Sequence, residues 1–313
     1  MKIALINYTH ADRMIGGVET RYQLLARALQ DAGHQCEFVA TEHVCYEEAV
    51  LVTSSCDVAI SDSAVCFPTV CPMITIFGNA WRGVLSVEDS EHVRQVVSLE
   101  SRWHHTHDTL RVAVSNYMAR EEMRSGGIVA WHTIPNPADI GRFSKQFKKN
   151  YPPTILWIGP FIAIKDHRLM ETVRGLLPLR HPDLNIQWQF SVRNGESALN
   201  YDQMTEAISK AALVLCTSVA EGCSNTLMEA IAADVPIVTT RTGLFWDWWD
   251  SRFGIRIEEH GDVDAFVCAI HEVITAAGNY LPRQAALDAG LDYRTWALRW
   301  RSLVVDYAER CRT

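Results

Sequence analysis

Two acidic residues in the second half of the chain have the spacing that chemistry at a sheet edge would use. Glu221 lies in a loop-like segment after an apolar run at 213–217, and Glu229 lies about one turn into a helix predicted at 225–233. Open α/β folds bind ligands at the carboxyl ends of their strands, so we expect both carboxylates to face such a crevice. A structural alternative is that Glu221 caps the helix and Glu229 is solvated. The backbone amides placed to receive hydroxyl or anionic groups of a ligand are those of Cys223, Ser224 and Asn225.

A pair of glycines near the N-terminus forms a second candidate site. Gly16 and Gly17 stand between a predicted strand at 2–7 and a predicted helix at 18–32. Glycine lets the backbone approach a ligand closely, and a helix N-terminus offers N–H groups to a phosphate. The same pair also makes an ordinary tight turn. The patterns GxGxxG and GxxxxGK[ST] are absent, so the sequence does not fit the usual NAD-binding or P-loop sites.

Short β-rich runs alternate with amphipathic helical stretches, and this alternation predicts an α/β protein with parallel sheets. In the first half we predict strands at 2–7, 35–40, 58–60, 73–77 and 111–115, and helices at 18–32, 87–105 and 116–124. In the second half we predict strands at 154–158, 186–190, 213–217 and 237–240, and helices at 167–176, 225–233, 263–276 and 293–312. A polar, proline-containing stretch near 148–153 separates domains at 1–148 and 149–292, and residues 293–313 form a terminal helix.

Composition restricts the class of protein. The chain has 313 residues, 48% of them hydrophobic, and a net charge of −8, as in an ordinary globular protein. It contains no apolar run of about 18 residues and no signal-peptide pattern, so we expect a cytoplasmic protein without a transmembrane segment. Its terminal helix leaves peripheral membrane contact open. The acidic charge does not favour a nucleic-acid partner.

Metal and disulfide sites are poorly supported by the sequence. The nine cysteines are odd in number and include no CxxC pair, so we interpret them as reduced thiols. His104, His107 and Asp108 share one face of a predicted helix, but no second cluster completes a ligand set. We therefore expect no bound metal.

Several motifs occur together in one order along the chain. Beside the glycine pair and the two glutamates, these are Val112-Ala113-Val114-Ser115, Ile134-Pro135-Asn136-Pro137-Ala138-Asp139 with Arg142-Phe143, and Ile158-Gly159 with Lys165. This ordered set resembles the retaining glycosyltransferases of family 4, which belong to the glycosyl transferases group 1. The resemblance implies a GT-B fold, with two Rossmann-like domains facing a central cleft and a C-terminal helix packing back toward the first domain.

The resemblance also implies a reaction and roles for particular residues. A nucleotide-diphosphate sugar, with UDP favoured over GDP, would donate its sugar to a hydroxyl acceptor such as a glycan, with retention and without a cofactor or metal. Glu229 would bind the ribose hydroxyls, Glu221 would lie by the donor sugar, and Lys165 would stabilise the departing diphosphate. The implied donor-binding set is Gly16, Gly17, Lys165, Cys223, Ser224, Asn225 and Glu229.

Two positions depart from the family pattern. Pro160 stands where the family has arginine, and Arg168 or Arg193 are candidates to supply that charge. Phe77 stands where the family has histidine, and Asn79 or Arg82 are candidates for its hydrogen bonds. Trp246, in the indole-rich segment 244–250, either contacts a sugar or acceptor or fills a packing gap.

Two other functions remain open at this point. The departures fit a binding protein that holds a nucleotide-sugar without transferring it. The GT-B fold also includes enzymes that glycosylate nucleic-acid bases, although residues 1–150 carry 14 Lys and Arg against 17 Asp and Glu.

Overall fold

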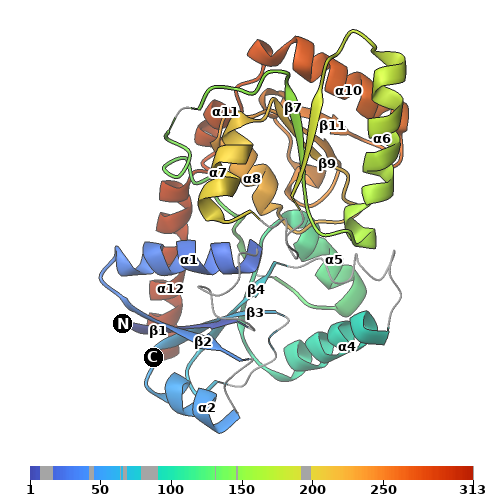
Figure 1. Ribbon diagram of the computed structural model, residues 1–313. Coiled ribbons are helices and arrows are strands. Elements are labelled where there is room, and N and C mark those ends of the chain that lie inside the picture. The colour runs from blue at the N-terminus through green and yellow to red at the C-terminus, as the bar shows by residue number, and fades with distance from the viewer. Residues whose placement is uncertain are drawn as a thin grey trace. The chain divides into compact units, whose positions relative to one another are not determined.

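The computed structural model describes residues 1–7, 17–41, 46–63, 65, 69–78, 91–130, 132–145, 147–191 and 199–312. Contacts divide the chain into a first unit, Met1–Asn136 with Arg294–Thr313, and a second unit, Pro137–Tyr293. Each unit holds one sheet of parallel strands flanked by helices (Figure 1). The structural boundary therefore precedes the predicted one at 148/149, because the segment from Pro137 onward packs with the second unit.

The first unit is built on a six-stranded parallel sheet in the order β2-β1-β3-β4-β5-β6. Its strands are β1 (Lys2–Asn7), β2 (Gln35–Ala40), β3 (Val58–Asp62), β4 (Met73–Phe77), β5 (Leu110–Ala113) and β6 (His132–Thr133). Its helices are α1 (Gly17–Gln30), α2 (Tyr46–Ser54), α4 (Glu91–Thr106), α5 (Asn116–Gly126) and α12 (Tyr293–Arg312). The central strands β3 and β4 are buried along their whole length, as expected for a parallel sheet covered on both faces.

The terminal helix α12 packs on the first unit, as predicted. Trp296 and Trp300 are buried and stack edge to face on one side of the helix. Arg301 donates from Nε to the carbonyl oxygen of Ala28 at 2.6 Å, which ties α12 to α1. Trp296 and Trp300 stand at helical spacing in the sequence, which is typical of such a buried side.

An acid-sensitive contact holds the far end of α12. Asp57, just before β3, accepts hydrogen bonds from the Lys2 backbone amide at 2.8 Å and from Arg312 Nη2 at 2.5 Å. These two bonds lower the pKa of the Asp57 carboxyl below its ordinary value of 3.8. A carboxyl with a lower pKa in the folded state stabilises that state at neutral pH, and the contribution is lost as the pH falls through the folded-state pKa.

We expect Asp57→Asn to destabilise the chain at pH 7 by at most about 1 kcal/mol, because the contact is partly exposed. The difference from the unmodified chain should shrink as the pH falls below about 4, where the wild-type carboxyl also becomes neutral. Thermal unfolding at pH 7, 5 and 3 measures this difference in stability. Asp31→Asn is the control, since the contact of Asp31 with α12 is an exposed one, 3.7 Å from Arg301. A difference that stays constant from pH 7 to pH 3 would contradict this explanation.

The second unit is built on a five-stranded parallel sheet in the order β11-β10-β9-β7-β8. Its strands are β7 (Thr154–Ile158), β8 (Gln187–Ser191), β9 (Leu213–Cys216), β10 (Ile237–Thr240) and β11 (Gly254–Ile257). Its α-helices are α6 (His167–Arg180), α7 (Tyr201–Lys210), α8 (Asn225–Ala232), α9 (Leu244–Asp247), α10 (Val263–Thr275) and α11 (Pro282–Asp288). The predicted α/β class with two parallel sheets is confirmed.

Helices cover both faces of the second sheet. A core of buried apolar residues joins β7, β9 and β10 to α6 and α10, and it includes Trp157, Met170 and Phe266. Helices α7 and α8 contact each other and the strands β7, β9 and β10 (Figure 1). None of the helices in the described ranges is long and apolar enough to cross a membrane. The cysteines that the structure describes are free thiols, and Cys45 and Cys66 lie outside its ranges.

Candidate functional site

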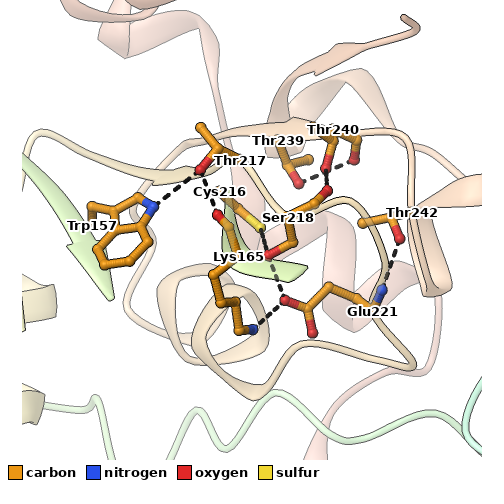
Figure 2. Close-up of polar contacts among 9 residues, drawn as sticks. All are labelled: Trp157, Lys165, Cys216, Thr217, Ser218, Glu221, Thr239, Thr240 and Thr242. Atoms are coloured by element: carbon orange, nitrogen blue, oxygen red, sulfur yellow. Dashed lines mark hydrogen bonds and ion pairs between the residues drawn. The ribbon is translucent and has the colours of Figure 1, made fainter. Parts of the chain in front are cut away.

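The structure brings Lys165 and Glu221 together at the carboxyl edge of the second sheet. Lys165 ends a short 3-10 helix, Ala163–Lys165, after β7, and Glu221 follows the neighbouring strand β9. Glu221 Oε1 accepts a hydrogen bond from Lys165 Nζ and another from Ser218 Oγ at 2.7 Å (Figure 2). Both charged side chains keep some exposure, 24% for Lys165 and 13% for Glu221. They form an ion pair that is open at one side.

Hydrogen bonds to Thr217 fix the segment that carries Lys165. The Thr217 hydroxyl accepts from Trp157 Nε1 at 3.2 Å and lies 2.9 Å from the carbonyl oxygen of Lys165, to which it donates. The backbone N–H of Val219 donates to the carbonyl of Ile164 at 2.8 Å. The Lys165 segment is thereby fastened to the end of β9, so its ammonium group starts from a fixed backbone position.

The loop that carries Glu221 is held by the segment after β10. The Glu221 backbone N–H donates to Thr242 Oγ1 at 2.9 Å, and the Thr240 hydroxyl donates to the carbonyl of Ser218 at 2.6 Å (Figure 2). Gly243 has a φ of 57°, and a Cβ atom there would lie 2.7 Å from the carbonyl oxygen of Gly222. Only glycine permits this close approach of the two loops. The two hydrogen bonds and this close approach therefore fix the backbone at Glu221.

A hollow of about 10 Å³ lies beside the ion pair, which is room for a single water molecule. Its polar lining comes from Lys165, Ser218, Glu221, Ser224 and Thr226, while Trp157 and Leu215 contribute apolar walls. Ser224 precedes α8 and its side chain makes no capping hydrogen bond. The start of α8, with its partial positive charge, thus lies at the same hollow as the ion pair.

Burial keeps the Cys216 thiol, which also lines this hollow, protonated. Burial, together with the negative charge of Glu221, raises the pKa of the Cys216 thiol. Its Sγ lies 3.4 Å from Ser218 Oγ. A buried thiol with a raised pKa is a poor nucleophile, so we assign Cys216 a packing role.

Glu229 is paired with an arginine from outside the glutamate motif. Arg142 donates from Nη1 to Glu229 Oε1 at 2.5 Å, and both side chains are largely buried, with 6% and 12% exposure. Glu229 Oε2 is covered and has no hydrogen-bond partner among the described residues. The sequence did not predict this pair, because Arg142 belongs to the motif near 134–143 and nothing in that motif indicates its partner.

The other predicted site residues lie near α8 and α9, at the start of α1, or outside the described residues. Cys223 is buried, Ser224 is the residue before α8, and Asn225 begins α8. Trp246 in α9 is 38% exposed, and the Arg241 guanidinium lies 4.9 Å from its ring centre. Gly17 begins α1. Gly16, Asn79, Arg82 and Arg193 lie outside the described residues.

The structure describes Phe77 and Arg168, the residues that bear on the two departures from the family pattern. Phe77 is buried at the end of β4, with its ring centre 4.7 Å from that of the buried His104. Arg168, one candidate for the charge missing at Pro160, is exposed on α6. The described part of the chain contains no cluster of three or more His, Cys, Asp and Glu residues that could hold a metal.

The sequence patterns also did not predict the hydroxyl groups that hold the site residues in place. Thr217, Thr240 and Thr242 stand at or just beyond the carboxyl ends of β9 and β10. Threonine and serine that follow an apolar strand are a usable signal, because the carboxyl ends of parallel strands meet at one sheet edge.

Known proteins support the same fold. Residues 183–276 match the family model described as Glycosyl transferases group 1. Sucrose-phosphate synthase from Thermosynechococcus elongatus has a similar structure, with a TM-score of 0.75, 12% identity, and 98% of each chain covered. No curated protein matches the sequence.

Two similar solved structures contain a bound nucleotide or nucleotide-sugar. Anabaena HepE, in complex with UDP-glucose, has a TM-score of 0.71 at 12% identity over 98% of this chain and 100% of its own. An alpha-glucosyltransferase, in complex with UDP and a DNA that contains a HMU base, has a TM-score of 0.63 at 13% identity over 99% of both chains. With these matches, the chain has the fold of the GT-B glycosyltransferases, and its residues 183–276 match the model of the glycosyl transferases group 1.

Proposed function

We propose that this protein is a retaining glycosyltransferase of family 4 that transfers a sugar from a nucleotide-diphosphate sugar to a hydroxyl acceptor. The observation that carries the proposal is the partly open Lys165–Glu221 pair beside the start of α8. A diphosphate brings negative charge that competes with Glu221 for the Lys165 ammonium group. The nucleotide in HepE makes UDP the first donor nucleotide to test.

The proposed reaction proceeds on one face of the donor sugar. The bond between the anomeric carbon and the diphosphate oxygen breaks, and the acceptor oxygen bonds to the same carbon from the same side. The acceptor proton passes to the departing phosphate oxygen. Lys165 stabilises the negative charge that develops on the diphosphate, and preorganised positive charge of this kind is most effective in the transition state. Glu221, released from Lys165, accepts hydrogen bonds from hydroxyls of the donor sugar.

The remaining donor contacts follow from the same placement. We propose that the amides of Cys223, Ser224 and Asn225 contact the sugar and phosphate, that Glu229 binds the ribose, and that Gly16 and Gly17 approach the diphosphate. Since Lys165 and the start of α8 provide positive charge, the proposal includes no metal. The free thiols of the described chain favour a reducing compartment, such as the cytoplasm.

A panel of UDP-, GDP-, ADP- and CMP-sugars tests the proposal. Binding is followed by thermal shift and slow hydrolysis by nucleotide release, with Glu229→Ala as the variant. We expect a shift and release with one nucleotide class, both lost in Glu229→Ala. A shift without release in the unmodified chain would favour a binding protein that does not transfer sugar. No response to any nucleotide would contradict the proposal.

A nucleic-acid acceptor is the second candidate function, because one similar structure is bound to DNA. Phosphate contacts made by Lys and Arg weaken steeply with salt. An affinity for duplex DNA that decreases as the salt is raised from about 50 to about 200 mM, together with sugar transfer to the duplex, would favour this candidate. Transfer to saccharides without duplex binding would favour a glycan acceptor.

A further inference from the structure

Arg142 makes several contacts in addition to its ion pair with Glu229. Its Nε donates to Thr205 Oγ1 at 2.8 Å, and its Nη2 donates to the carbonyl of Tyr201 at 3.1 Å. The guanidinium also stacks on the Tyr201 ring, 3.6 Å from the ring centre. These contacts come from α7, whereas Glu229 belongs to α8. The planar, multiply donating head of arginine is suited to such a set, and lysine could not reproduce it.

The pairing engages only one of the two oxygens of Glu229. Arg142 Nη1 binds Oε1, whereas Oε2 has no partner among the described residues and is covered. A buried acceptor without a hydrogen bond costs about 1–3 kcal/mol. A donor that reaches Oε2 recovers this cost. The arrangement therefore favours a ligand whose hydroxyl group donates to Oε2.

We propose that Arg142 is a positioning residue, which holds Glu229 by Oε1 so that Oε2 accepts a hydrogen bond from a ribose hydroxyl of the donor nucleotide. This inference rests on the proposed function, because it assigns Glu229 to the nucleoside. Arg142 belongs to the second unit, as Glu229 does, and α7 fixes its guanidinium. It therefore sets the Glu229 carboxylate from outside the glutamate motif. Arg142 does not touch the ligand in this arrangement.

The matched control is Arg283, which lies in the same unit and resembles Arg142 in its connections. It donates from Nε to the carbonyl of Ala232, at the end of α8, and from Nη2 to the carbonyl of Phe143. Arg283 thus also joins the segment near 143 to α8, but none of these bonds involves Glu229. Arg283→Gln measures what the loss of such a link does to stability alone.

The experiment measures UDP affinity by calorimetry for the unmodified chain, Arg142→Gln, Arg142→Lys, Glu229→Gln, the Arg142→Gln/Glu229→Gln double variant and Arg283→Gln. We expect Arg142→Gln to weaken UDP binding about tenfold, and Arg142→Lys to recover part of this loss because it keeps the charge. In the Glu229→Gln background, Arg142→Gln should have no further effect. The KM for the donor should rise in each variant that loses UDP affinity, while kcat changes little.

Deoxynucleotides give a readout that a structural role would not move. The unmodified chain and Arg283→Gln should both prefer UDP to 2′-deoxy-UDP or 3′-deoxy-UDP. Arg142→Gln and Glu229→Gln should lose that preference. Arg142→Gln that lowers the melting temperature as Arg283→Gln does, with the preference intact, would overturn the inference and leave the proposed function standing. An equal effect of Arg142→Gln with and without Glu229 would also overturn it. If the panel identifies another nucleotide class, the same measurements use that nucleotide and its deoxy forms. Absence of binding to every nucleotide of the panel in the unmodified chain would overturn both.

Discussion

Lys165→Ala is expected to lower the rate of sugar transfer by about 100- to 1,000-fold, the usual loss when one preorganised charge-stabilising group is removed. In the proposed reaction, Lys165 is the side-chain cation beside the departing diphosphate. Its removal also leaves Glu221 with Ser218 as the remaining side-chain donor to Oε1 among the described contacts. Negative charge would then accumulate where the diphosphate must bind.

Initial rates with a saturating donor and acceptor measure this effect, and single-turnover rates separate chemistry from product release. Lys210→Ala is the matched control, because Lys210 pairs with Glu206 on an exposed face of α7 and lies in the same unit. The control should keep its rate, and both variants should fold, since Lys165 is partly exposed. A Lys165→Ala enzyme within threefold of the unmodified rate would exclude Lys165 as the required cation.

Asp62→Ala is expected to destabilise the first unit by about 3–5 kcal/mol, the range found when one partner of a buried ion pair is removed. Asp62 ends β3 and accepts from Arg21 Nη2 at 2.6 Å, and both side chains are 3% exposed. Gly78 makes room for this pair, because a Cβ atom there would lie 1.9 Å from Arg21 Nη1. Without Asp62, the Arg21 charge stays buried without its carboxylate partner.

Urea unfolding, followed by a probe of the first unit, measures this loss. The double variant Arg21→Met/Asp62→Leu should regain most of the stability, because it removes the buried charge rather than one partner of it. Glu37→Ala is the surface control. Glu37 pairs with Lys2 at 2.7 Å with both side chains well exposed, so its loss should cost less than about 1 kcal/mol. A cost for Asp62→Ala equal to that of Glu37→Ala would contradict the explanation.

Much of the fold follows from local sequence patterns. Strands β1, β2, β4, β7 and β10 have the same ends as the predicted runs, because each is an apolar segment bounded by polar or turn residues. Helix α7 was missed even though Asn200 and Gln203 form a capping box at its start. Met204, Ala207 and Ile208 are buried and have helical spacing, so this periodicity and the capping box were both available clues.

Strand β11 was missed for a different reason. It begins at Gly254, whose φ is 140° and whose Cβ atom would lie 2.0 Å from the carbonyl oxygen of Ile237 on β10. Glycine usually disfavours a strand, so local propensity is misleading here. Contact with β10 decides the conformation, and a residue's distant partner is not visible in its neighbours along the chain.

The candidate site, like the fold, depends partly on local sequence patterns and partly on tertiary contacts. The sequence alone determined that Lys165, Glu221 and Glu229 follow strands of a parallel sheet, because the alternation of strands and helices places such residues at the carboxyl edge. The tertiary structure decided that β7 neighbours β9, which brings Lys165 to Glu221. It also decided that Arg142 reaches Glu229, 87 residues away in the chain. Strand order and helix packing depend on contacts between distant segments, and hydrophobic periodicity carries no information about which segments become neighbours.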